Sequence, residues 1–186
     1  MDGLGATMAG AAQAAWPLRI AQGALRLLRR LVDLTLILLL GIMILAVLAQ
    51  VAGRYVFNFS IGEATELATF AQIWMVLLGA GYAMRERLHV SIETLVEMLP
   101  PLLARLLMLP VAALCLWFLW VVFDGGLQLL EIGAIQTSAA LQISMEIPYV
   151  ALPVSAAYLA LEAALAFGGI LLGLKPITTG GGVRVD

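Results

Sequence analysis

The sequence predicts an all-α integral membrane protein with four transmembrane helices and both ends of the chain in the cytoplasm. Of the 186 residues, 63% are apolar and 12% are charged, and the mean hydropathy is +1.04. An ordinary soluble domain has about 25% charged residues, and one of this size exposes too much surface to hide so much apolar material. The apolar residues also gather into four long stretches, and the basic residues gather in alternate connections.

Each apolar stretch is long enough to cross a bilayer as a helix, which takes about 20 residues. The first three contain uncharged runs of 20, 18 and 18 residues, and the fourth has one charged residue, Glu162. The predicted spans cover about 31–53, 67–84, 102–130 and 147–174. Together they form a membrane domain over 31–174, and no internal repeat divides it.

The remaining segments are predicted to lie on the cytoplasmic side. Residues 1–30 are expected to be a flexible N-terminal segment whose arginine-rich part, 19–30, suits either an amphipathic surface helix on anionic lipid or a plain charged flank. Between the second and third spans, apolar residues recur at helical spacing over 88–99, which predicts a short amphipathic helix in the interface. Residues 175–186 form the predicted cytoplasmic tail.

The distribution of basic residues sets the predicted orientation. Nine of the ten Lys and Arg residues lie on one side if both termini are inside, and the other side has only Arg54. Because basic residues near helix ends stay in the cytoplasm, and because an even number of spans returns the chain to the same side, we expect both termini to be cytoplasmic.

The sequence lacks the patterns of several other protein classes. It has no dinucleotide, phosphate-loop, zinc-protease or serine-hydrolase motif. The net charge of −2 provides no basic field for nucleic acid, and one cysteine and one histidine do not suit a multi-thiolate or bis-histidine site. We therefore expect no enzyme, no cofactor, no metal site and no nucleic-acid partner.

Glu162 is the ionisable residue deepest in a predicted span. A charge at the centre of a spanning helix costs about 2.5–3.5 kcal/mol on insertion scales. The side chain can therefore be read as a proton or ion ligand, or as a protonated or paired glutamate at a helix contact. On a helical wheel it shares a face with Ser155, Tyr158, Gly169 and Gly173.

The opposite face of this last span carries a small residue at every fourth position: Ala156, Ala160, Ala164 and Gly168. Small residues allow the backbones of neighbouring helices to approach closely. We therefore expect the helix to be packed on two sides, against its own bundle on one and against another protein on the other. In the second span, Gln72 and Gly79 share a face, and Gln72 is expected to form a hydrogen bond between helices.

The non-cytoplasmic end of the bundle carries charged residues that suggest an ion pair. Arg54 follows the first span, and the acids Glu66 and Asp124 are predicted at a similar depth, together with Glu63. A structural ion pair of Arg54 is expected there. Asp124, with Gln128 and Glu131, can be read either as the solvated end of a helix above an aromatic belt or as an acidic outward surface on which a periplasmic partner can dock.

Three segments carry a resemblance to a known family: GRYVFNFSIGEATELATFAQIW, LLGAGYAMRERLHVSIETLVEMLP and TSAALQISMEIPYVALPVSAAYL. With their order and four predicted spans, the sequence resembles the small membrane subunit of tripartite ATP-independent periplasmic (TRAP) transporters, the DctQ-like family, over about residues 31–170. The family often has a Trp and two adjacent acids before the second span, whereas only Glu66 matches here.

The resemblance implies a place in the bacterial inner membrane and a role in sodium-coupled uptake (symport) of an organic acid such as a dicarboxylate. In this family a periplasmic binding protein delivers the substrate transiently, and a large membrane subunit carries it across. The small subunit is implied to be a scaffold for that large subunit. The alternative from the residues is a self-contained small proton- or ion-coupled transporter or channel that uses Glu162.

Overall fold

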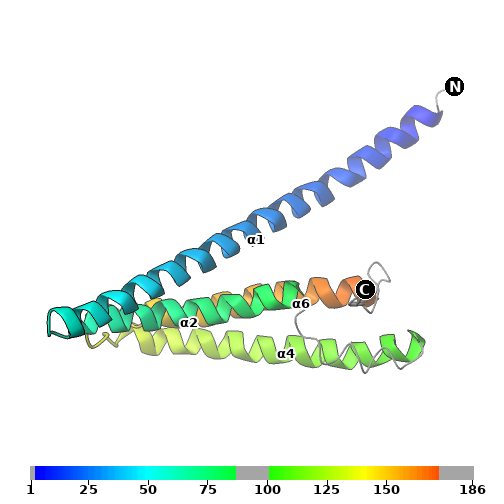
Figure 1. Ribbon diagram of the computed structural model, residues 1–186. Coiled ribbons are helices and arrows are strands. Elements are labelled where there is room, and N and C mark those ends of the chain that lie inside the picture. Colours follow the sequence, from blue (N-terminus) through cyan, green and yellow to red (C-terminus); the bar gives the residue numbers. More distant parts are fainter. Residues whose placement is uncertain (1–2, 87–100, 172–186) are drawn as a thin grey trace, which may run out of the picture. The chain divides into compact units, whose positions relative to one another are not determined.

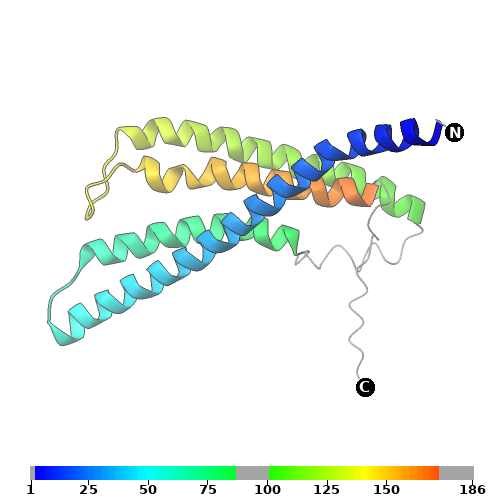
Figure 2. The same cartoon turned by 90° about the horizontal axis from the view of Figure 1, so that it is seen from above.

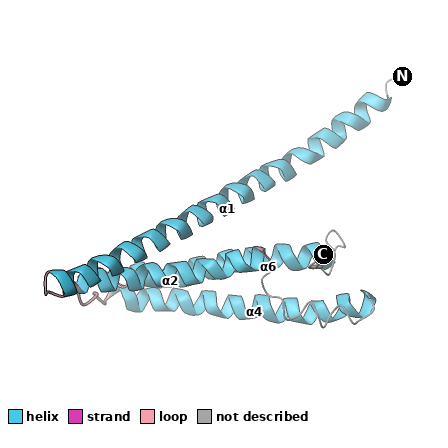
Figure 3. Ribbon diagram, in the orientation of Figure 1, coloured by secondary structure: helices cyan, strands magenta, loops and turns pink. Residues whose placement is uncertain are grey.

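The computed structural model describes residues 3–86 and 101–171, and in these ranges the regular elements are helices joined by a turn and a loop, with no strand (Figures 1 and 3). The helices are α1 (Gly3–Val56), α2 (Gly62–Arg85), α4 (Pro101–Ala134), α5 (Glu146–Tyr149) and α6 (Ala151–Leu171). Four segments are long and apolar enough to cross a membrane: Arg19–Val56, Gly62–Arg85, Leu106–Ala134 and Glu146–Gly169. The predicted all-α fold with four membrane-spanning segments is confirmed.

The first helix is longer than the predicted span. α1 begins at Gly3, so residues that were expected to be flexible continue the same helix, and no break separates 19–30 from the span. The chain divides into two compact units within this helix, Met1–Leu38 and Leu39–Asp186. In the first unit, Arg26 Nε donates to the Gln22 carbonyl at 3.3 Å and Thr35 Oγ1 to the Leu31 carbonyl at 2.8 Å.

In the second unit, α6 packs against both α2 and α4 and lies between them (Figure 2). The α1–α2 turn and the α4–α5 loop meet at one end of these helices, because a Cβ on Gly62 would be 3.6 Å from Ala140 Cβ. We call this the loop end, made of residues 57–61 and 135–145. α2 and α6 both start there, so the two helices run parallel.

The α1–α2 turn is held by the backbone of its own residues. The Phe59 N–H donates to the Gly53 carbonyl at 3.1 Å, and Asn58 between them has a φ of 56°. Asparagine is enriched in this left-handed region, where most side chains are strained. A Cβ on Gly53 would be 3.0 Å from Ile61 Cδ1, so glycine allows the turn to approach α1 closely at this point.

The predicted fourth span consists of two helices, α5 and α6. They are separated at Val150, whose N–H donates to the Glu146 carbonyl at 2.8 Å. Pro153 has no N–H to donate to the Tyr149 carbonyl four residues earlier, so the helical bonding is interrupted there. Pro153 therefore lies in the first turn of α6, where the backbone N–H groups have no partner within the helix and the absence of one N–H breaks no hydrogen bond of α6.

Much of the apolar surface of the second unit faces outward. In the span of α4, only 17% of the most apolar window is buried, and in the α5–α6 span the share is 39%. Trp117 and Trp120 of α4 are each 65% exposed and Phe118 is 61% exposed. Such a surface is stable against lipid or a membrane partner, whereas in water it would be a large exposed apolar patch. The chain is therefore a multi-pass membrane protein.

Three predictions fall on residues outside the described ranges. These are the interfacial helix over 88–99, Gly173, and the tail over 175–186. The cytoplasmic placement of both termini likewise stays a prediction.

Candidate partner interface and buried polar residues

The contact between α2 and α6 depends on a glycine facing an aromatic ring. A Cβ on Gly81 would lie 2.4 Å from Cδ1 and 2.5 Å from Cε1 of Tyr158, so no larger residue fits without movement. Nearer the loop end, the Trp74 indole Nε1 donates to the Ile147 carbonyl at 3.1 Å. Leu78, between these two points on α2, is buried. These contacts fix the register of α2 on α5 and α6.

The contacts of α4 with α5 and α6 also depend on glycines that face a bulky side chain. A Cβ on Gly126 would be 2.8 Å from Pro153 Cδ, and one on Gly133 would be 2.8 Å from Tyr149 Cδ2. Glycine at both positions lets the backbones of α4, α5 and α6 approach closely, as small residues do between membrane helices.

Glu162 is buried inside the chain, with 2% of its surface exposed. It shares its helix face with Ser155 and Tyr158, which are also buried, and the Tyr158 ring contacts α2. The hydroxyl Oγ of Ser155 has no hydrogen-bond partner within the described residues. The predicted Glu162 face thus packs against a helix of the same chain. Gly169 of this face is half-buried near the end of α6.

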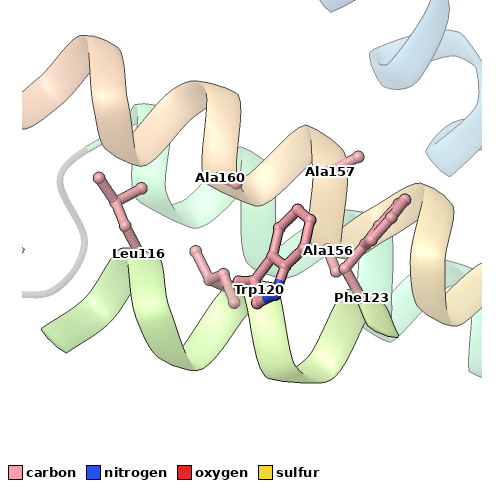
Figure 4. Close-up of a pocket in the computed structure, with 7 residues that line it drawn as sticks. Leu116, Trp120, Phe123, Ala156, Ala157 and Ala160 are labelled. Atoms are coloured by element: carbon pink, nitrogen blue, oxygen red, sulfur yellow. The ribbon is translucent and has the colours of Figure 1, made fainter. Parts of the chain in front are cut away.

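The small-residue face of α6 is divided between an internal contact and the surface. Ala156 is buried, whereas Ala160 and Gly168 are half-buried and Ala164 is exposed. A groove of about 240 Å³ runs between α4 and this face (Figure 4). Its lining is apolar throughout: Leu116, Leu119, Trp120, Phe123, Ala156, Ala157 and Ala160.

The two-sided packing expected for the last span therefore takes a different form. Both faces of α6 have neighbours in the same chain, α2 on the Glu162 side and α4 on the alanine side. The groove and the exposed residues Ala157 and Ala164 are among the parts of α6 that remain accessible to another molecule.

At the loop end, Glu66 holds the connection between α4 and α5. Its Oε2 accepts the N–H groups of Ala140 at 3.0 Å and Leu141 at 2.7 Å. The loop itself folds back as a short hairpin, with an isolated antiparallel bridge between Thr137 and Ser144. Charged acceptors form hydrogen bonds about twice as strong as neutral ones, so Glu66 acts as a clamp between α2 and this loop.

The hairpin is closed by side chains of its own. Gln142, with a φ of 53°, donates from Nε2 to the carbonyls of Ser138 at 3.1 Å and Ala139 at 2.9 Å. The Ser138 N–H donates to the Ile143 carbonyl at 2.8 Å, and Ser138 is buried at 3% exposure.

The predicted ion pair of Arg54 is not formed within the described part of the chain. Glu66 binds the loop backbone, and Asp124 Oδ2 accepts a hydrogen bond from Gln128 Nε2 at 2.9 Å. Arg54 is exposed and no ion pair joins it to a described residue. The sequence predicts that these residues lie at a similar depth in the membrane, but depth does not determine the face of the helix on which each side chain lies.

Gln72 and Gly79 are also placed differently from the expectation. Gln72 is exposed, and no described residue forms a hydrogen bond with its amide. A Cβ on Gly79 would meet nothing within 4 Å. Their shared face of α2 is thus open, and Gln72 does not bridge two helices of this unit.

Sequence reasoning missed the residues that fix the packing, namely Trp74, Gly81, Gly126 and Gly133. The signal in the sequence was that each is a glycine or a Trp inside an apolar span, but such residues are common in membrane helices. Within residues 3–86 and 101–171, no group of three His, Cys, Asp or Glu side chains is placed to hold a metal ion.

The comparisons with known proteins agree with this architecture. Residues 43–172 match the family described as tripartite ATP-independent periplasmic transporters, DctQ component. Over 79 residues, or 42% of the chain, the sequence is 37% identical to the C4-dicarboxylate TRAP transporter small permease protein DctQ of Vibrio cholerae. Over 74 residues, or 40% of the chain, it is 35% identical to a Haemophilus influenzae protein provisionally named a TRAP transporter small permease protein.

The matched segments span 34% and 46% of these two relatives, so the pairwise likeness covers less than half of either protein. The family match covers more than two thirds of the present chain and includes α2, α4, α5 and α6. The chain therefore belongs to the DctQ component family of tripartite ATP-independent periplasmic transporters.

Proposed function

We propose that this chain is a scaffold subunit of the inner membrane, which braces the large membrane subunit of a TRAP-type transporter. That complex would carry out sodium-coupled uptake of an organic acid delivered by a periplasmic binding protein. The supporting observation is the apolar groove between α4 and α6, with a floor of alanines and a wall formed by Trp120 and Phe123. A groove floored by small residues admits the side-chain ridge of a partner helix.

The packing of the second unit supports a fixed rather than a moving role. α6 contacts α2 through Gly81 and Tyr158, and α4 through Gly126 and Pro153, with little room for one helix to slide past another. The outward faces remain apolar, including Trp117, Phe118 and Val121. A rigid unit with a broad apolar surface suits a brace that stays in place while its partner moves.

The exposed polar residues near the loop end favour a part in docking the binding protein. Asp124, Gln128 and Glu131 are all exposed on α4, and Glu66 of α2 binds the hairpin of residues 136–145 that follows α4. We propose this surface as the side that faces the periplasm.

The bracing role is tested by replacing a small residue of the groove with a larger one, at a position whose side chain does not contribute to the buried packing of this chain. Ala157 is exposed and lines the groove, so Ala157→Leu fills it without displacing a buried neighbour. We expect co-purification of the large subunit to fall about tenfold, equal to ~1.4 kcal/mol of association free energy. Val154→Leu is the matched control, because Val154 is 45% exposed on α6 and does not line the groove.

Normal yield of the complex from Ala157→Leu would remove the groove as the interface. The second candidate function, a self-contained ion-coupled transporter, is favoured by the buried Glu162 alone. It predicts that vesicles containing only this chain accumulate solute and lose that activity in Glu162→Gln. The bracing role predicts no uptake by such vesicles and uptake only when the large subunit and the binding protein are supplied.

A further inference from the structure

The register of α2 on α6 brings two oppositely charged residues to the same level. Trp74 contacts the backbone at Ile147 before the start of α6, and further along the parallel helices Gly81 lies at the level of the Tyr158 ring. Arg85 and Glu162 each follow the last of these contacts by four residues. Four residues are about one helical turn, or ~6 Å along the axis, and residues four apart share a helix face.

Both side chains are withdrawn from the surface of the chain. Glu162 is 2% exposed and the side chain of Arg85 is 14% exposed. By contrast, Glu86, whose Oε1 accepts a 3.0 Å hydrogen bond from Arg85 Nε, is 46% exposed. The exposed pair with Glu86 does not explain why the arginine side chain is turned into the protein.

The guanidinium of Arg85 is oriented by its neighbours on α2. Its Cζ lies 4.5 Å from the centroid of the Tyr82 ring, and Nε is directed to Glu86. A guanidinium has five N–H donors in a fixed plane, and the hydrogen bond to Glu86 uses only the one on Nε. The carboxylate of Glu162 is the acidic group at the same level on the adjoining helix.

We propose that Arg85 and Glu162 form an ion pair that fastens α2 to α6 at the end opposite the loop end. A lone charge within a membrane span is costly, whereas a paired one is tolerated, and Arg suits a carboxylate because it can bind both oxygens. α2 is then held by Glu66 near the loop end, by Trp74 near its middle and by Arg85 at its last residue. The ion pair would make the brace more rigid, and this consequence rests on the proposed function.

The experiment measures the melting temperature of the full chain in nanodiscs, which does not require any partner and so is independent of the bracing role. Arg85→Gln and Glu162→Gln are each expected to lower it by about 5 °C or more, since removing one member of a buried pair leaves the other charge uncompensated. The double variant is expected to lose less than the sum of the two. The exchange Arg85→Glu with Glu162→Arg is expected to recover at least half of the loss.

Glu86→Gln is the matched control, because it removes the exposed partner of the same arginine, and exposed pairs contribute little. A loss from Glu86→Gln as large as that from Arg85→Gln would show that Arg85 acts through Glu86 and would overturn the proposal. Strictly additive losses in the double variant, with no recovery in the exchange, would overturn it as well.

A second measurement keeps the inference testable where Glu162→Gln fails to fold. With Cys115 replaced by Ala, cysteines at 85 and 162 are expected to be joined by a short bifunctional thiol reagent in membranes. Cysteines at 85 and 161 are the control, because Leu161 is 41% exposed on another side of α6. Equal cross-linking of the two pairs would place Arg85 away from Glu162 and contradict the ion pair.

Discussion

At the scale of single residues, Gly81 is the described glycine whose added Cβ would come closest to a neighbouring side chain. Its Cβ would lie 2.4 Å from a ring atom of Tyr158, which is only 6% exposed and has little room to move. We expect Gly81→Ala to lower the free energy of unfolding by about 1–3 kcal/mol, the usual cost of overpacking a core. Thermal unfolding of the full chain in detergent measures this effect.

Gly79 provides the matched control on the same helix. A Cβ there meets nothing within 4 Å, so Gly79→Ala is expected to leave the melting temperature unchanged or slightly raised, as alanine is the better helix former. Equal destabilisation by both substitutions would mean that the cost arises from the helix itself and not from the Tyr158 contact.

Glu162 illustrates what can be learned from a single residue in the sequence. The sequence alone predicted that this acid is either a ligand or part of a helix contact, because a charge in an apolar span needs some compensation. It could not identify the neighbouring helix, since that depends on the register of α2 against α6. The structure supplies this register through Gly81 and Tyr158, neither of which carries a charge signal.

At the scale of elements, the α4–α5 loop depends on a side chain from another helix. Glu66 of α2 accepts the N–H groups of Ala140 and Leu141, and we expect Glu66→Ala to release both amides. Their hydrogen exchange should then accelerate about tenfold or more, since a hydrogen bond to a charged group contributes roughly 1.5–3 kcal/mol.

Hydrogen exchange followed by mass spectrometry of peptides covering 136–145 tests this expectation. Glu63→Ala is the control, because Glu63 lies in the first turn of α2, just before Glu66, and is exposed. Unchanged protection of the loop in Glu66→Ala would show that the hairpin is stable through Gln142 and its own backbone bonds alone.

The helices themselves were largely predictable, because each apolar run approaches the thickness of a bilayer. The α1–α2 turn and the division between α5 and α6 were not predicted, since both depend on local backbone bonding at Asn58 and Pro153. The expected ion pair of Arg54 failed for a related reason. Hydropathy gives the depth of a residue in the membrane, but the side of the helix on which it lies follows from packing.

At the scale of the whole molecule, the interpretation of the two faces of α6 depends on which helices pack against them, namely α2 and α4. The sequence showed two faces suited to packing and assigned one to a partner, whereas α2 and α4 cover much of both. The groove that we propose for a partner is instead built from two helices, α4 and α6, which no pattern within one helix reveals. This is why the groove at Ala157 and Trp120 is a stronger candidate interface than the alanine stripe alone.

The orientation of the molecule in the membrane is the prediction on which the periplasmic role of the loop end depends. Nine of ten basic residues lie on one side if both termini are cytoplasmic, so we expect the loop end to face the periplasm. Gln142 is exposed in the hairpin. In a chain with Cys115→Ala, a cysteine at 142 should react in intact cells with a thiol reagent that cannot cross the inner membrane, and a cysteine at 184 should react only after lysis. The reverse pattern would place the hairpin and the acidic residues of α4 in the cytoplasm, where no periplasmic protein reaches them.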